Sequence, residues 1–130
     1  MNRSEMREQA FVLLYESEFF KDKPVLELEE VYSENIDTLS EYGKALFEGS
    51  VSQKEELDGI VEKFLKGWTL ARISKVNLAI LRLALYEMIN CDNVPESVVI
   101  NEAVELAKKY SGTDDSKFVN GILGSFSRSR

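Results

Sequence analysis

Hydrophobic residues recur along this chain mainly at intervals of three and four positions, the spacing of one face of an α-helix. No segment shows the turn-bounded alternation of apolar and polar residues that is typical of a β-strand. Only two prolines, Pro24 and Pro95, interrupt the pattern. The sequence therefore predicts an all-α fold, a compact bundle of six to seven helices.

Capping residues and breaks place the individual helices. Asn2 and Glu5 have the spacing of a capping box, and so do Thr38 and Glu41, while Ser74 is expected to cap a later helix. We expect helices at 2–20, 25–34, 38–65, 75–90, 95–110 and 115–126, with a single helical turn after residue 69. The segment 38–65 is thus predicted to be one long helix that ends before Gly67.

The helix at 75–90 differs from the others because it is apolar on most sides. Its polar residues form only a narrow stripe through Lys75, Arg82 and Tyr86. A helix with this distribution is surrounded by other helices rather than lying on the surface. We therefore expect it to form the centre of the bundle.

The chain has 130 residues, which is the size of one domain, and we expect a single domain over 1–130. Its formal net charge of -7 argues at first against a nucleic-acid partner. However, the segment from Lys21 to Glu62 holds 12 acidic residues and 4 lysines, a balance of -8. From Lys108 onward the balance is +3, so a local basic surface is compatible with the acidic total.

Several kinds of chemistry are excluded by composition and motif. The chain has no histidine and one cysteine, Cys91, so neither a histidine base nor an intramolecular disulfide is available. We find no phosphate-binding loop, dinucleotide fingerprint, nucleophile with a base, or metal-ligand spacing, and therefore expect no catalytic residues, metal or cofactor. No apolar stretch is long enough to span a bilayer, and a signal-peptide pattern is absent, so we expect a cytoplasmic protein.

The first helix has apolar residues on two faces. One face carries Met6, Ala10 and Leu13, and the other carries Phe11, Tyr15 and Phe19. Two interpretations remain open: the helix is sandwiched inside the domain, or its aromatic face is a docking surface for a protein partner.

Two further groups suggest contacts with RNA. Arg3 and Arg7, four residues apart, are either solvated side chains or part of an arm that binds phosphates. In the last helix, Phe118 lies off the apolar stripe next to Lys117, where an aromatic ring and a cation could hold an unpaired base, although a boundary phenylalanine also fits. Gly121 and Gly124 lie inside the same helix, and we expect them to allow a close approach of helices.

Four stretches together resemble one known family. They are RISKVNLAILRLALYEM at 72–88, Val94-Pro95, INEAVELAK at 100–108 and KFVNGIL at 117–123. In order and spacing they resemble the NusB family of bacterial transcription antitermination factors, over about residues 7–123. The resemblance implies a non-enzymatic, all-helical factor that pairs with NusE, a ribosomal small-subunit protein. The pair would bind boxA RNA and join the antitermination complex on RNA polymerase.

The resemblance also implies roles for particular residues. Tyr15 matches the tyrosine that contacts the partner, and Asn77 occupies a usually acidic position near that surface. Phe118 matches the aromatic that contacts RNA, and the amino-terminal arm is reduced to Arg3 and Arg7. We therefore predict an RNA-binding set of Arg3, Arg7, Lys117 and Phe118, and a partner-binding set of Phe11, Tyr15, Phe19 and Asn77.

Two alternatives to this function stay open. The first is a protein-only scaffold whose RNA binding has weakened with its arginine arm. The second is a part of an RNA-modifying enzyme, because such domains also occur fused to ribosomal RNA methyltransferases; no cofactor-binding segment is present in this sequence. Some family members self-associate, so a homodimer is a further expectation to test.

Overall fold

The computed structural model describes all residues, 1–130, and contains helices but no strand. The helices are α1 (Arg3–Ser17), α2 (Val25–Asn35), α3 (Glu41–Ser52), α4 (Lys54–Lys63), the single 3-10 turn η1 (Leu70–Arg72), α5 (Lys75–Asn90), α6 (Glu96–Tyr110) and α7 (Thr113–Arg128). The predicted all-α class is confirmed, with seven α-helices.

Most helix starts follow the predicted local signals. The Asn2 side chain accepts a hydrogen bond from the Glu5 amide, and the Glu5 carboxylate accepts one from the Asn2 amide, so the capping box forms. Ser74 caps α5 by accepting from the amide of Asn77. Pro95 stands at the N-cap of α6, directly before its first turn. These starts are encoded within a few residues of sequence.

The prediction of one helix over 38–65 is wrong in two respects. The cap is Ser40, whose hydroxyl accepts from the Gly43 amide, whereas the carbonyl of Thr38 is held by the side chain of Gln9. The segment also breaks at Gln53 into α3 and α4. The break turns the chain so that α3 packs on α1 and α5, and α4 on α5. Tertiary packing therefore overrides a continuous helical pattern.

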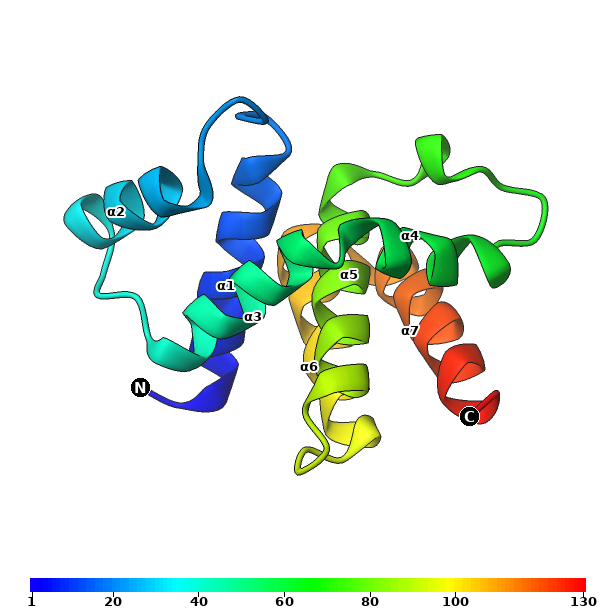
Figure 1. The fold of residues 1–130 in the computed structure, drawn as a ribbon. Coiled ribbons are helices and arrows are strands. Elements are labelled where there is room, and N and C mark those ends of the chain that lie inside the picture. Colours follow the sequence, from blue (N-terminus) through cyan, green and yellow to red (C-terminus); the bar gives the residue numbers. More distant parts are fainter.

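Helix α5 lies at the centre of the bundle, as predicted, and packs against α1, α3, α4, α6 and α7 (Figure 1). Arg82 of its polar stripe is itself buried, at 5% exposure. Its guanidinium binds both carboxylate oxygens of Asp58 at 2.7 and 2.9 Å and lies 3.4 Å from Glu18. Burial lowers the pKa of Arg82, but the Asp58 and Glu18 carboxylates outweigh it, so the pKa is raised and the charge is retained.

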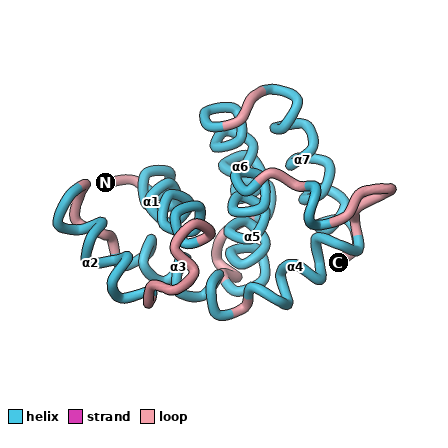
Figure 2. The backbone as a smooth tube through the Cα atoms, turned by 90° about the horizontal axis from the view of Figure 1, so that it is seen from above, coloured by secondary structure: helices cyan, strands magenta, loops and turns pink.

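The helices fall into two groups around α5. Figures 1 and 2 show α1, α2 and α3 on one side and α6 and α7 on the other. One hydrophobic core nevertheless includes residues from all seven α-helices. The expectation that Gly121 and Gly124 allow close helix packing is wrong. A Cβ added at Gly121 would meet no atom within 4 Å, and one at Gly124 would meet only the Arg128 side chain of the same helix. None of the helices combines the length and apolarity that crossing a membrane requires.

Candidate nucleic-acid and partner interface

A row of aromatic rings runs along α1 and into the turn after it, because the helix predicted to reach residue 20 ends at Ser17. The ring centroids of Phe11 and Tyr15 are 6.2 Å apart, and those of Tyr15 and Phe19 are 5.0 Å apart. At its inner end the row continues to Tyr110 of α6, whose ring centroid lies 4.8 Å from that of Phe11. The spacing of four residues places these rings on one face, as the sequence predicted.

Exposure along this row increases toward the end of α1. Phe11 is only 2% exposed, Tyr15 is half-buried and Phe19 is 53% exposed. Phe11 is therefore a core residue, and its assignment to the partner surface is replaced by a packing role. Tyr15 and Phe19 keep their predicted position at the surface. The inner part of this face is thus packed inside the domain, and docking stays a prediction for its exposed outer part.

The outer end of the row meets the start of α5. The Lys75 ammonium lies 5.6 Å from the centroid of the Phe19 ring, within the range of a cation–π contact. Asn77, one turn inside α5, is 4% exposed and donates a hydrogen bond to Asp115 of α7 at 3.0 Å. Its own side-chain oxygen has no hydrogen-bond partner. Asn77 therefore joins α5 to α7 as a buried residue, and its assignment to the partner surface is replaced by this packing role.

Phe118 lines a pocket at this same end of α5. The pocket has a volume of about 320 Å³ and is lined by residues of η1, α5 and α7 together with Trp68. Trp68 is 58% exposed, and the guanidinium of Arg72 lies 5.7 Å from the centroid of its ring. Two aromatic faces and an arginine suit an unstacked nucleobase.

Sequence reasoning did not assign Trp68 or Arg72 to this site. Both precede α5 in a segment that turns at Gly67, whose φ of 76° favours glycine. An aromatic residue and an arginine four positions apart, directly after a glycine turn, are the sequence feature that could have identified them. Their proximity to Phe118, about fifty residues later, follows only from the packing of α5 and α7.

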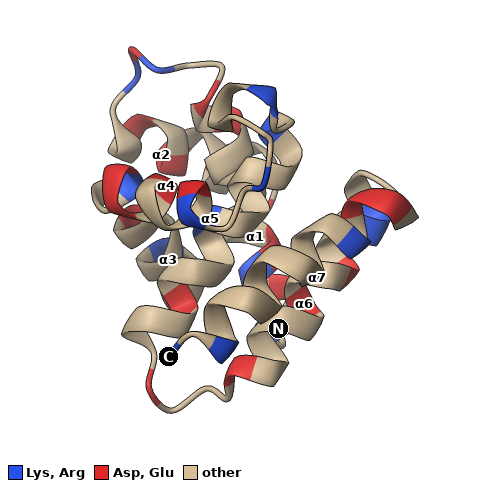
Figure 3. Ribbon diagram, turned by 90° about the vertical axis from the view of Figure 1, so that its right-hand side faces the viewer, with Lys and Arg blue, Asp and Glu red and all other residues tan.

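Acidic groups lie beside the aromatic pocket. Asp114 and Asp115 are in its lining, and hydrogen bonds from Ser111 and Asn77 lower the pKa of Asp115 below its usual value. Figure 3 shows Lys or Arg and Asp or Glu positions interspersed where α6 meets α7 (Figure 3). The pocket therefore offers acceptors for base edges, but the same charges repel a phosphate backbone.

Lys117 and Gly121 flank Phe118 on the exposed side of α7. Lys117 is exposed and makes no ion pair within the chain. Gly121, one turn further along, leaves open space where a side chain would stand. A ligand therefore has access to this side of Phe118.

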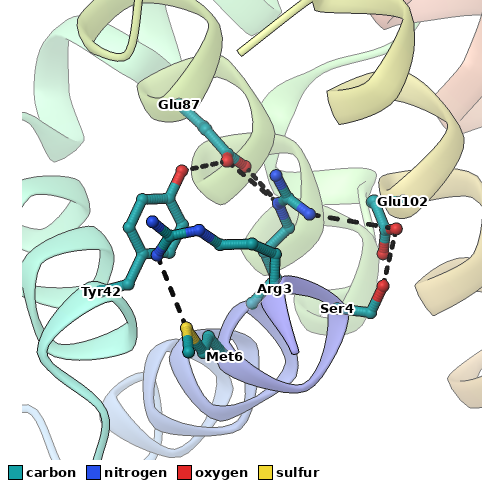
Figure 4. A network of polar contacts seen from close by, with 7 residues as sticks. Arg3, Ser4, Met6, Tyr42, Glu87 and Glu102 are labelled. Atoms are coloured by element: carbon teal, nitrogen blue, oxygen red, sulfur yellow. Dashed lines mark hydrogen bonds and ion pairs between the residues drawn. The ribbon is translucent and has the colours of Figure 1, made fainter. Parts of the chain in front are cut away.

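The structure places Arg7 in the interior. It is 4% exposed, and its Nε lies 2.8 and 3.0 Å from the two carboxylate oxygens of Glu87, which is 1% exposed. The Tyr42 hydroxyl also donates to Glu87 (Figure 4). Burial lowers the pKa of Arg7, but the Glu87 carboxylate outweighs it and the pKa is raised. Arg7 is thus a buried ion-pair partner and is not available to a phosphate.

Arg3 is exposed but lies away from Phe118. Its guanidinium stacks 3.7 Å from the centroid of the Tyr42 ring and donates to the Met6 sulfur (Figure 4). Tyr42 contacts the last turns of α5, whereas Phe118 is at its first turn. Glu87 follows Asn77 by ten residues, so the parts of α5 next to the two predicted RNA contacts are about 15 Å apart along the helix.

The chain is similar to known proteins of one family over nearly its whole length. The NusB family model matches residues 4–128. The transcription antitermination protein NusB of Acetivibrio thermocellus is 50% identical over 127 residues, which cover 95% of this chain and 87% of that protein.

Two solved structures have the same fold. NusB of T. maritima is 33% identical, with a TM-score of 0.86 over 98% of this chain and 92% of that one. A structure of the antitermination factors NusB and NusE in complex with double-stranded RNA is also 33% identical, with a TM-score of 0.85 over 98% of this chain and 97% of its own.

Proposed function

The chain belongs to the NusB family, and on that premise we propose that it is a non-enzymatic antitermination factor of the cytoplasm. It pairs with NusE, binds boxA-type RNA in nascent ribosomal RNA transcripts, and joins the antitermination complex of RNA polymerase through that pair. The observation that carries this proposal is its likeness, over nearly its whole length, to a NusB chain solved with NusE and double-stranded RNA.

The partner surface in this proposal is the outer part of the aromatic row. Tyr15 and Phe19 supply rigid aromatic area, and Lys75 adds a positive charge over the Phe19 ring. Aromatic residues often act as anchors in protein interfaces because they bury much area at a low cost in conformational entropy. Asn77 is buried in the first turn of α5 and holds α5 against α7 through its hydrogen bond to Asp115.

The RNA surface in this proposal is centred on Phe118. Its ring and that of Trp68 would stack on bases, while Lys117 and Arg72 would contact the backbone. Arg3, which stacks on Tyr42 near the last turns of α5, would provide a separate phosphate contact. The number of free cations is small and Asp114 lies beside them, so the chain alone should bind RNA weakly. The basic surface of the partner would supply the remaining affinity.

An RNA titration tests the proposal. Binding of a boxA-type RNA to the chain, with and without NusE, would be measured by fluorescence anisotropy at 50 and 200 mM salt. Both single-stranded and double-stranded forms would be included, because the related complex contains double-stranded RNA. We expect tight, salt-dependent binding only with NusE present. Absence of binding to either form, with both proteins folded, contradicts the proposed function.

Phe118→Ala separates this function from that of a protein-only scaffold. The variant should lose about tenfold or more in RNA affinity, because one stacking contact is worth about 1–3 kcal/mol, and should bind NusE normally. Ile36→Ala is the matched control, since Ile36 is an apolar residue 62% exposed elsewhere on the surface. Equal RNA binding by both variants favours the scaffold.

Phe19→Ala makes the complementary test of the partner surface. It should weaken NusE binding while the fold is retained, because half of this side chain is already exposed. Sedimentation velocity of the chain at increasing concentration tests self-association, and a homodimer that NusE dissociates would indicate that the two contacts share this surface.

A further inference from the structure

Residues 63–75, which join α4 to α5, form a basic connection that contains cations but no aspartate or glutamate. The stretch without an acidic residue continues to residue 86 and is the longest in the chain. All cations of the basic connection are exposed, and none makes an ion pair within the chain; they are Lys63, Lys66, Arg72 and Lys75. The basic connection is therefore a positively charged surface in a protein whose net charge is -7.

The basic connection also exposes an aromatic ring among these cations. Trp68 is 58% exposed, and the Arg72 guanidinium lies 5.7 Å from the centroid of its ring. Figure 1 shows this part of the chain as an open loop between the end of α4 and the start of α5 (Figure 1). The turn η1 packs on α4, so the cations of η1 and of the end of α4 lie in one region of the surface. One exposed ring and several free cations thus share this region.

The basic connection supplies part of the wall of the Phe118 pocket, through Trp68 and Arg72. The α7 part of the wall carries Asp114 and Asp115, whose carboxylates repel a phosphate group. A nucleotide whose base occupies the pocket therefore gains most when its backbone turns toward the basic connection and away from α7. The arrangement of charge around the pocket gives an RNA strand a preferred direction.

The exposed ring favours a nucleic acid over an acidic protein segment as the ligand of this surface. Proteins that bind single strands combine cations that contact phosphates with aromatic rings on which bases stack. An acidic peptide would pair with the cations, but it has no planar group to cover Trp68. A base stacked on that ring would use both features of the basic connection at once.

We propose that a single RNA strand runs from the Phe118 pocket along the basic connection, with a base on Trp68 and the adjoining phosphates on Lys63 and Lys66. The inference rests on the proposed function, because it requires an RNA ligand. It adds phosphate contacts in the middle of the chain, whereas the arginines predicted for that role are at the amino-terminal end. One of those, Arg7, is buried and unavailable.

Trp68 gives a direct readout, because it is the only tryptophan of the chain. The chain would be labelled with fluorinated tryptophan, combined with unlabelled NusE and titrated with single-stranded boxA-type RNA, while fluorine NMR follows the single resonance. We expect the RNA to shift this resonance, since a base stacked on the ring changes its surroundings. A glutamate-rich peptide of equal charge should leave the resonance in place. An equal shift with the peptide would identify a protein-docking surface and overturn the proposal.

Two double variants test the phosphate contacts. Lys63→Gln with Lys66→Gln removes two exposed charges from the basic connection, and Lys21→Gln with Lys108→Gln removes two exposed charges elsewhere. RNA affinity of each variant with NusE would be measured by fluorescence anisotropy at 50 and 200 mM salt. Each single-strand phosphate contact contributes about 0.7 to the slope of log affinity against log salt. Relative to 1 M salt, the first variant should lose about tenfold at 200 mM and about sixtyfold at 50 mM, and the second less than about twofold.

The outcomes separate this inference from the function on which it rests. RNA binding with an unmoved fluorine resonance, or with equal losses in the two double variants, refutes the path along the basic connection and leaves the proposed function standing. Absence of RNA binding by the unaltered complex contradicts the proposed function and the path together. Thermal unfolding of each variant verifies that the fold is kept, as expected for lysines that are all exposed.

Discussion

Substitution of Arg7 by methionine tests whether this arginine belongs to the core or to an RNA surface. In the structure it donates to both oxygens of Glu87 at 2.8 and 3.0 Å, and the Tyr42 hydroxyl is the other donor. Methionine fills a similar volume but leaves the Glu87 charge without its cation. Breaking a buried ion pair in this way costs about 3–5 kcal/mol, because the remaining charge is still desolvated.

The expected loss can be converted to a melting temperature. An unfolding entropy of about 2.1 cal/mol/K per residue over 130 residues makes 3–5 kcal/mol equivalent to a decrease of roughly 10–20 °C. Thermal unfolding followed by circular dichroism measures it. Arg3→Met is the control, since Arg3 is exposed and its loss should cost less than about 1 kcal/mol.

A second substitution distinguishes the ion pair from simple packing. Adding Glu87→Gln to Arg7→Met removes the unpaired charge, and part of the lost stability should return. RNA affinity of Arg7→Met with NusE, measured well below its melting temperature, should equal that of the parent. The core role of Arg7 is refuted if the single variant melts within about 3 °C of the parent and binds RNA more weakly.

Three further predictions concern stability. Burial in α2 and the neighbouring Glu48 carboxylate raise the pKa of Glu29 to about 7, against 4.5 in the unfolded chain. The folded state thus binds this proton more tightly, and the contribution to stability is lost as the pH rises through about 7. Glu29→Gln should therefore be more stable than the parent by up to about 3 kcal/mol in urea unfolding at pH 8, with the difference shrinking as the pH falls from about 7 to 4.5; a constant difference contradicts this pKa. Gly49→Ala should destabilise the fold by about 1–3 kcal/mol, because the added Cβ would lie 2.1 Å from Cζ of Tyr86. Gly59→Ala, where the added Cβ meets open space, should stabilise α4 by up to about 1 kcal/mol. Equal effects of the two substitutions would show that α3 and α5 are not in contact at Gly49. Gly121→Ala should raise the melting temperature but weaken RNA binding, and unchanged binding would place the RNA elsewhere.

The sequence by itself determined the elements whose signals are local. Asn2 with Glu5, and Ser74 before α5, identify helix starts because a cap and its amide are only two or three residues apart. The central position of α5 was predictable from its apolar surface, since only a surrounded helix can bury so many sides. The four quoted motifs likewise indicated the family before any contact was known.

Only the tertiary structure decided what the polar and aromatic side chains do. Arg7 and Arg3 have the same side chain and lie four residues apart in one helix, yet Arg7 pairs with Glu87, 80 residues away, and Arg3 remains exposed. The break at Gln53 and the burial of Phe11 depend in the same way on neighbours that are distant in sequence. A side chain's free energy is set by burial and by its partners, and these are properties of the packed bundle rather than of the local sequence.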